Sequence, residues 1–263
     1  AQTHAVTATG RHRQQHRAPM NRLASVIAAS VLATGCVSVP PEQRVAHDRW
    51  EPLNRGIYRF NDAFDRATLR PIAKGYQKII PSPIRRGVTH FSKNLSTPGS
   101  AINNFLQGKP RDGFGELTRF IVNSTIGIVG LVDIAGASGL EERPEDFGQT
   151  AAVWGAPPGP YVVLPFLGPH SVREVLTLPL DIEVDPLAHV DRSSVRDPLW
   201  ALRLIDLRAR LLGLDALLKD SNDPYVTMRE SYLQNREFLI YDGDPPDDED
   251  DDFYDEFLEE EDY

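Results

Sequence analysis

Apolar residues recur along residues 51–241 at the spacing of an α-helix, and proline or glycine interrupts them at intervals. In the first such segment, Leu53, Ile57 and Phe64 fall on one helical stripe while polar residues fill the positions between them. Proline is well tolerated in the first turn of a helix, so a new helix is expected at or near each proline that opens an apolar stripe. These prolines are Pro71, Pro83, Pro98, Pro110, Pro198 and Pro224.

Two segments depart from this helical pattern. Residues 126–140 are apolar but contain four glycines and one acid, Asp133. Residues 155–169 contain five prolines and three glycines around Tyr161–Leu164, which predicts an extended segment with no room for a regular helix. Residues 181–196 are polar and give no clear indication of structure. Since no strand alternation stands out elsewhere, the chain is predicted to be all-α, built from short, proline-interrupted amphipathic helices.

The apolar faces of these helices allow two arrangements. In the first, each face packs into a common core, which is the usual fate of an amphipathic helix. In the second, the helices form a ring-like or flat bundle with a polar interior, embedded through an outer apolar belt in one leaflet of a membrane. The pattern alone leaves both arrangements open for any one helix.

The N-terminal region has the features of a secretory signal. Residues 20–35 combine Arg22 with an apolar stretch of eleven residues, which is too short to span a bilayer. The sequence Leu-Ala-Thr-Gly-Cys then ends at Cys36, the single cysteine of the chain, and resembles a bacterial lipobox. We therefore expect Cys36 to be acylated, residues 36–50 to form a lipidated tether, and residues 1–19 to be an unstructured upstream extension.

Charge is distributed unevenly along the chain. The net charge is −10, but residues 242–263 carry fourteen acidic residues and no Lys or Arg, while residues 36–241 are neutral. A neutral body argues against a nucleic-acid-binding protein, which needs a basic face. The acidic segment repels itself and is predicted to be a disordered tail following a helical domain over residues 51–241.

Catalytic motifs are missing. The sequence contains no zinc-protease, nucleophile-elbow, Walker or dinucleotide-binding motif. His170 lies near Glu174, but no nucleophile accompanies them, and the carboxylates at 141–146 are better explained as a solvated loop than as a cation site. Trp154 is interpreted as a packing anchor rather than a substrate platform. We therefore expect no catalytic residue, metal or cofactor, although a triad assembled by folding stays possible.

Several motifs, in order, resemble the MlaA (VacJ) family of outer-membrane lipoproteins. The resemblance covers residues 50–240, and departures are confined to the N-terminal extension, residues 181–196 and the acidic tail. The motifs are Glu51-Pro-Leu-Asn-Arg55, Asn103-Asn-Phe-Leu-Gln-Gly108, Thr118-Arg-Phe-Ile-Val-Asn-Ser-Thr-Ile-Gly127, Gly130-Leu-Val-Asp-Ile-Ala-Gly136, Glu145-Asp-Phe-Gly-Gln149, Gly159-Pro-Tyr-Val-Val-Leu-Pro-Phe166 and Ser221-Asn-Asp-Pro-Tyr225.

The resemblance implies a transport function. Members remove mislocalised phospholipids from the outer leaflet of the outer membrane through an amphipathic channel, and so maintain lipid asymmetry. It implies three partners: phospholipid, a trimeric outer-membrane porin and a soluble periplasmic lipid carrier. It also implies that the chain is lipid-anchored in the periplasmic leaflet of the outer membrane. A lipid hydrolase and a structural scaffold for porins stay open as alternatives.

Five residues are candidates for the lipid path. They are Asn103, Phe105, Gly127, Gly130 and Asp133. In the segment 126–140, glycines either pack a buried turn tightly or leave room for acyl tails in a flexible wall. The sequence favours the second interpretation only slightly, and a bulky side chain at Gly130 would distinguish the two.

Overall fold

The computed structural model describes residues 48–246. The chain divides into two units, residues 1–35 and residues 36–263, and only the second contains described residues. The predicted signal peptide, Cys36, most of the tether and most of the acidic tail therefore lie outside the described residues.

The described chain is mainly helical, as the spacing of its apolar residues predicts. Its α-helices are α2 (Glu51–Phe64), α3 (Arg70–Ile79), α4 (Ser82–Leu106), α5 (Pro110–Thr125), α6 (Ile134–Ala137), α7 (Phe147–Val153), α8 (Val172–Val184), α9 (Ser193–Arg210), α10 (Leu214–Asp220) and α11 (Pro224–Ile240). A π-helical turn, η2 (Asp65–Leu69), and two 3₁₀ turns, η3 (Pro186–His189) and η4 (Leu211–Gly213), connect some of them. Within residues 48–246, no helix combines the length and the apolar character needed to cross a bilayer.

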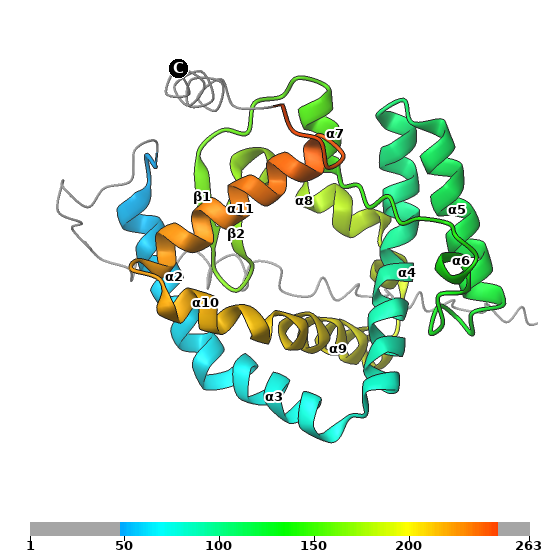
Figure 1. The fold of residues 1–263 in the computed structure, drawn as a ribbon, viewed down its shortest axis with the longest axis horizontal. Helices are drawn as coiled ribbons and strands as arrows, with labels where there is room; N and C mark the ends of the chain where they lie inside the picture. Colours follow the sequence, from blue (N-terminus) through cyan, green and yellow to red (C-terminus); the bar gives the residue numbers. More distant parts are fainter. Residues whose placement is uncertain (1–47, 247–263) are drawn as a thin grey trace, which may run out of the picture. The chain divides into compact units, whose positions relative to one another are not determined.

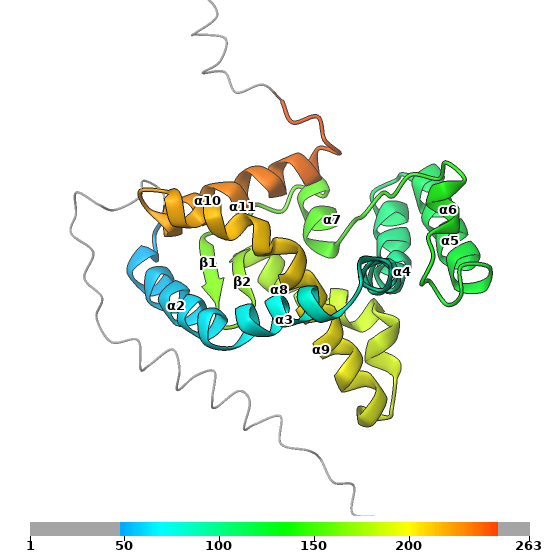
Figure 2. The same cartoon turned by 60° about the horizontal axis from the view of Figure 1, so that its bottom comes forward.

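The helices of this unit follow one another round a circuit (Figure 1). From α2 the chain runs along α3 and α4, and α4 contacts α7, which in turn contacts α11. The circuit closes through a small hairpin that touches α2 on one side and α8 and α11 on the other. Helix α9 packs against both α3 and α4, while α5 and α6 lie beyond α4 (Figures 1 and 2).

The hairpin is formed by the proline-rich segment that was expected to be extended. Strand β1 (Tyr161–Leu164) pairs antiparallel with β2 (Gly168–Ser171), and Tyr161 lies opposite Ser171. The extended conformation is confirmed, but its pairing was not predicted. Tyr161 and Val163 are buried in a small apolar cluster with Ile57 of α2 and Tyr225 of α11, so the hairpin joins the first and last described helices.

Two expected helix starts are wrong, because Pro98 lies inside α4 and Pro198 lies inside α9. Pro71 falls in the first turn of α3, as expected, although α3 continues directly from α2 through η2. Hydroxyls next to Pro98 bond to the preceding turn: Thr97 Oγ1 donates to the carbonyl of Lys93 at 3.1 Å. These hydroxyls bond to the carbonyls of Ser92 and Lys93 and not to that of Asn94, which is the one that Pro98 leaves without its helical donor.

The remaining expectations for helix ends are mixed. Asp223 caps α11 as predicted, since its carboxylate accepts from the backbone N–H groups of Tyr225 and Val226. Residues 181–196, which gave no clear signal, contain the end of α8, η3 and the start of α9. The structure therefore confirms an all-α fold with one small hairpin added.

Candidate functional site

Burial in the described chain is inverted relative to a water-soluble domain. The buried side chains are mostly polar, while many large apolar side chains are exposed. Ile79 is 76 % exposed, Leu176 is 73 % exposed and Ile126 is 68 % exposed. Soluble monomers rarely show so much apolar surface, so many of these exposed side chains are suited to an apolar environment.

Amide side chains organise the polar interior. Asn54 of α2 is 1 % exposed and binds β1 from both ends of its amide. Its Nδ2 donates to the carbonyl of Tyr161 at 3.0 Å, and its Oδ1 accepts from the N–H of Val163 at 2.9 Å. Asn61 repeats this arrangement with Leu164 and Phe166. Hydrogen bonds of this kind are what make buried polar groups tolerable.

A cavity of about 820 Å³ opens between α4, α8, η3 and α9. Part of its wall is apolar, and the other part carries carboxylates and guanidinium groups. The apolar side chains are Leu95, Leu167, Leu178, Ile182, Val184, Ala188 and Trp200. The charged side chains are Glu145, Asp146, Asp181, Asp185, Arg196 and Arg203. A cavity of this volume with two kinds of wall is suited to a molecule that is itself amphipathic.

An ion pair fixes the charged wall where α8 and α9 meet. Arg203 Nη1 lies 2.5 Å from Asp185 Oδ2, and both side chains are largely buried. The other amino group of Arg203 donates to Ser96 Oγ of α4 at 3.1 Å. The guanidinium also lies over the ring of Trp200, 4.8 Å from its centroid. Arg203 therefore holds three elements together at the cavity.

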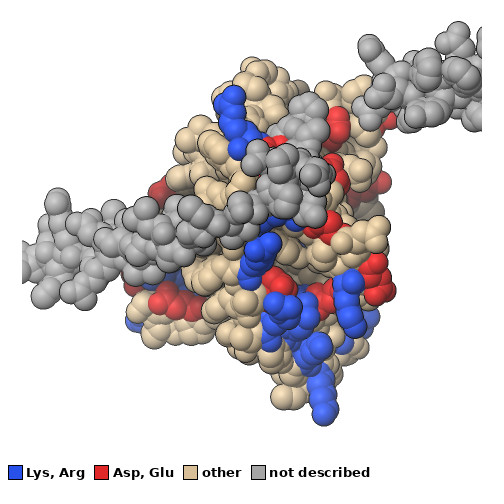
Figure 3. All heavy atoms as spheres, turned by 90° about the vertical axis from the view of Figure 1, so that its left-hand side faces the viewer, with Lys and Arg blue, Asp and Glu red and all other residues tan. Residues whose placement is uncertain are grey.

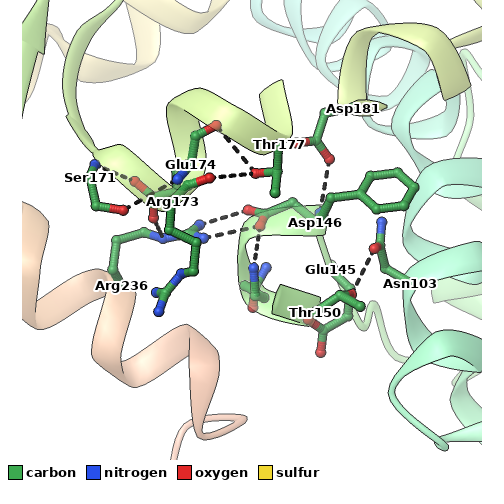
Figure 4. A network of polar contacts seen from close by, with 12 residues as sticks. Asn103, Glu145, Asp146, Thr150, Ser171, Arg173, Glu174, Thr177, Asp181 and Arg236 are labelled. Carbon is green, nitrogen blue, oxygen red and sulfur yellow. Dashed lines mark hydrogen bonds and ion pairs between the residues drawn. The ribbon is translucent and has the colours of Figure 1, made fainter. Parts of the chain in front are cut away.

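A second polar network lies behind the cavity (Figure 4). Arg236 of α11 forms two hydrogen bonds to Asp146, of 2.7 and 3.0 Å, and an ion pair with Glu174 of α8. Burial would raise the pKa of Asp146, but the hydrogen bonds and charge of Arg236 outweigh burial and lower it. Glu174 also accepts from the N–H of Ser171 at 2.8 Å and so completes a capping box for α8.

Asp181 stands between this network and the cavity. Its Oδ1 accepts a hydrogen bond from the N–H of Phe147 at 3.0 Å. No Arg or Lys in the described range forms an ion pair with it, and the nearby carboxylate of Asp146 adds a second negative charge. Burial, reinforced by the negative charge of Asp146, raises the pKa of Asp181 to about 6.

The glycine-rich segment 126–140 lies elsewhere. It follows α5 and includes α6, on the side of α4 away from α8 (Figures 1 and 2). A Cβ on Gly127 would meet the carbonyl oxygen of Val132 at 2.2 Å, and one on Gly130 would meet Asn94 Nδ2 at 2.6 Å. The geometry therefore favours the tightly packed turn over the flexible wall, although Ile128 and Val129 are exposed.

Asp133 has a structural role in that turn. Its carboxylate caps α6 by accepting from the N–H of Gly136 and also binds Arg119 and Asn123 of α5. Burial would raise its pKa, but these hydrogen bonds and the charge of Arg119 lower it overall. The negative charge of Asp133 is therefore stabilised by Arg119, Asn123 and the N–H of Gly136.

The two other path candidates belong to α4. Asn103 is fully buried, donates to the carbonyl of Gly99 and accepts from Thr150 Oγ1 at 2.7 Å. Phe105 is partly exposed and stacks edge-on against Phe114. None of the five path candidates lines the 820 Å³ cavity. Their contact with lipid stays a prediction.

The other residues that the sequence analysis considered for catalysis or binding also have partners within the protein. His170 Nδ1 lies 3.3 Å from the carbonyl oxygen of Gly168, whereas Glu174 binds Arg236. Trp154 is 65 % exposed and donates to the carbonyl of Leu106, so it is not a buried anchor. In residues 48–246, no group of three or more His, Cys, Asp or Glu side chains could hold a metal ion.

Sequence analysis missed the charged residues that do line the cavity. Asp181 and Asp185 are four residues apart with Leu178 and Ile182 between or beside them, which is a helical spacing that mixes charge with apolar side chains on one face. Arg196 and Arg203 lie seven residues apart on α9, a spacing that also places two side chains on one face of a helix. That spacing was the available signal, hidden by the polar composition of 181–196.

Comparisons with known proteins agree with this geometry. A family model described as MlaA lipoprotein matches residues 46–239. The intermembrane phospholipid transport system lipoprotein MlaA of Shigella flexneri is 35% identical over 227 residues, which cover 84% of this chain and 90% of the relative. The protein of the same name from Haemophilus influenzae is 33% identical, with 83% and 90% covered.

A solved structure supports the same relationship. It was described as the structural basis for maintenance of bacterial outer membrane lipid asymmetry. The two chains are 35% identical, with a TM-score of 0.66 over 73% of this chain and 98% of the other. Sequence and fold thus agree over nearly the whole length of the relatives, and the chain belongs to the MlaA lipoprotein family.

Proposed function

We propose that this chain carries phospholipid through the cavity between α4, α8 and α9, removing phospholipid mislocalised in the outer leaflet of the outer membrane. The observation that carries the proposal is the cavity itself, whose wall is apolar on one part and charged on another. A phospholipid has a charged headgroup and apolar tails, so a path for it needs both kinds of wall. The relatives are lipoproteins of a phospholipid transport system, which supports the same substrate.

The exposed apolar side chains support a position within one membrane leaflet. Full burial of a Leu or Ile side chain contributes about 1.5–3 kcal/mol, so several of them provide a strong attraction to lipid. On α3, exposed Ile72 and Ile79 lie beside exposed Lys74 and Lys78, a combination typical of helices at a membrane surface. In Figure 3, basic side chains gather at the lower edge, where Figure 1 places α3.

The anchor and the partners complete the proposal. An acylated Cys36 would hold the chain at the periplasmic leaflet of the outer membrane, with the exposed apolar surface as a second attachment. We propose a trimeric porin as a neighbour and a soluble periplasmic carrier as the acceptor of the lipid. These partners rest on the family resemblance.

A lipid hydrolase is the less favoured alternative. Glu174 is engaged by Arg236 and by the N–H of Ser171, so it is not placed to orient His170 as a general base. Passage of lipid without bond cleavage also fits the relatives' names.

The test is to fill the cavity. Ala188 lies in its wall, so Ala188→Trp is expected to fold, reach the membrane and fail to clear surface phospholipid in cells lacking the native gene. Ala137→Trp, at an exposed position of α6 outside the cavity, is the matched control and should clear normally. Normal clearance by both variants would show that lipid takes another route, and release of fatty acid by the purified protein would favour the hydrolase.

A further inference from the structure

Asp181 is the carboxylate in the cavity wall that no basic side chain neutralises. Three other carboxylates line the same cavity, and each of them forms an ion pair. These pairs are Glu145 with Lys109, Asp146 with Arg236, and Asp185 with Arg203. Within residues 48–246, Asp181 has only the N–H of Phe147 as a hydrogen-bond donor. One of its two carboxylate oxygens is therefore free to bind a ligand from the cavity.

Keeping a negative charge at this position is unfavourable for the empty protein. Asp181 is half-buried, and Asp146 and Glu174 add negative charge around it, which the N–H of Phe147 and the charge of Arg236 offset only in part. An asparagine could accept the same hydrogen bond from Phe147 without burying a charge. An unpaired carboxylate in the wall of a binding cavity is therefore best explained by a cationic group that enters the cavity.

Positive charge lines the same cavity close by. Asp181 lies in the last turn of α8, and Asp185 directly follows the end of that helix. Arg203 of α9 is bound to Asp185, and Arg196, in the first turns of α9, is bound to its exposed neighbour Asp197. The same cavity wall thus offers guanidinium groups and a carboxylate without an ion-pair partner. A zwitterionic headgroup carries a phosphate and an ammonium group that could contact both kinds of side chain.

We propose that Asp181 selects the lipid headgroup by binding the ammonium of an amine-bearing zwitterionic phospholipid, while Arg196 and Arg203 bind its phosphate. The proposal rests on the proposed function, since it assumes that the cavity receives phospholipid. The ammonium donates to the free oxygen of Asp181 in a charge-assisted hydrogen bond. A phosphatidylglycerol headgroup provides no cation there and brings a net negative charge towards Asp181.

The size of the preference follows from this single contact. One charge-assisted hydrogen bond in a partly buried site changes affinity by about five- to tenfold. We therefore expect the cavity to accept both kinds of phospholipid and to favour the amine-bearing one by about this factor. Asp181 acts here as a specificity-determining residue, and total lipid uptake should depend on it only weakly.

The test is a competition between two headgroups with the same acyl chains. The full-length lipoprotein in detergent micelles is equilibrated at pH 7.5 with equal amounts of phosphatidylethanolamine and phosphatidylglycerol and then re-isolated. Bound lipid is extracted and counted by mass spectrometry. We expect about five- to tenfold enrichment of phosphatidylethanolamine in the wild type, and a ratio near one in Asp181→Asn.

Two further variants make the result specific. Glu183→Gln removes a carboxylate from the same helix at a position that is 79% exposed and outside the cavity, and should keep the enrichment. Asp181→Glu keeps the charge and should keep most of the preference. Loss of enrichment in Glu183→Gln would attribute the effect to overall charge and overturn the proposal.

The wild-type result distinguishes failure of the role of Asp181 from failure of the proposed function of the cavity. Bound lipid without headgroup preference would overturn the role of Asp181 while leaving the cavity as a lipid site. Absence of bound lipid would instead overturn the proposed function itself. Because the wild type alone gives both readings, the test does not depend on the stability of any variant.

Discussion

Arg236 of α11 and Asp146, which precedes α7, are joined by two hydrogen bonds across ninety residues of sequence. The same guanidinium also pairs with Glu174 of α8, so one side chain connects three helices behind the cavity. Breaking a buried pair by removing one partner typically costs about 3–5 kcal/mol, because the other charges remain buried.

Arg236→Ala should therefore lower the free energy of unfolding strongly. The measurement is urea unfolding of the detergent-solubilised protein, because the denaturant guanidinium chloride is a salt and would screen the charges. The expected loss in the free energy of unfolding is about 3 kcal/mol or more. Arg111→Ala, at an exposed position of α5, should change stability by less than about 0.5 kcal/mol. Equal effects of the two substitutions would show that the network behind the cavity contributes little.

Gly130→Leu should destabilise the fold rather than narrow a lipid path. Gly130 has a φ of 84°, which a leucine tolerates poorly, and a Cβ there would come within 2.6 Å of Asn94. We expect a loss of at least about 1–3 kcal/mol in thermal or urea unfolding. Gly139→Ala has a similar φ of 87° but open space around it, so it isolates the backbone contribution. If Gly130→Leu is stable and correctly localised but fails to clear phospholipid, residues 126–140 line the lipid path after all.

Asp181→Asn should stabilise the empty protein at neutral pH and have little effect at pH 4. The pKa of Asp181 is about 6 in the folded state, above its ordinary value of 3.8, so the folded state binds the proton more tightly. Stability from this group is therefore present below pH 4 and lost as the pH rises towards 6. The groups that face it are Asp146, Glu174, His170 and Arg236.

Melting temperatures of both proteins between pH 4 and 8 would check this. The difference should grow between pH 4 and 6 and then stay constant. A difference that is independent of pH would mean that Asp181 does not titrate in this range. The same measurement on Glu183→Gln controls for loss of a carboxylate elsewhere on α8.

Cys36→Ser should prevent acylation at that residue, which lies outside the described residues. Mass spectrometry of the mature N-terminus is the direct measurement, and an unmodified Cys36 thiol in the wild type would contradict the predicted anchor. Because large apolar side chains such as Ile79 and Leu176 are exposed, the variant should still associate in part with membranes. Complete release into the soluble fraction would show that these side chains do not bind lipid.

The helical class was predictable because apolar spacing is a local property of the chain. The helix boundaries were less so: Pro98 and Pro198 lie inside helices, where packing of α4 and α9 against other elements outweighs the local cost of proline. Strand β1 is hydrogen-bonded to Asn54, a residue of α2 that lies more than one hundred residues away in the sequence. No window of local sequence contains that information.

The site was less predictable than the fold. Glycines at 127 and 130 suggested open space, but the structure fills that space with Val132 and Asn94. The residues that line the cavity come from α4, α8 and α9, and their shared wall exists only after these helices meet. Sequence indicated the kind of path required, amphipathic and without catalytic groups, but the five residues that it named for the path do not line the cavity between α4, α8 and α9.

The inverted burial has a consequence for how the chain reaches its native state. Hydrophobic collapse in water would draw inward the side chains, such as Leu176 and Ile126, that the native structure leaves outside. Collapse and native packing are therefore in conflict, a form of frustration that water-soluble domains avoid. Micelles or lipid present from the first moment of refolding would accommodate those side chains and should give a higher yield of native protein than lipid added after dilution. We therefore predict that the surrounding amphiphile takes part in the folding reaction of this chain.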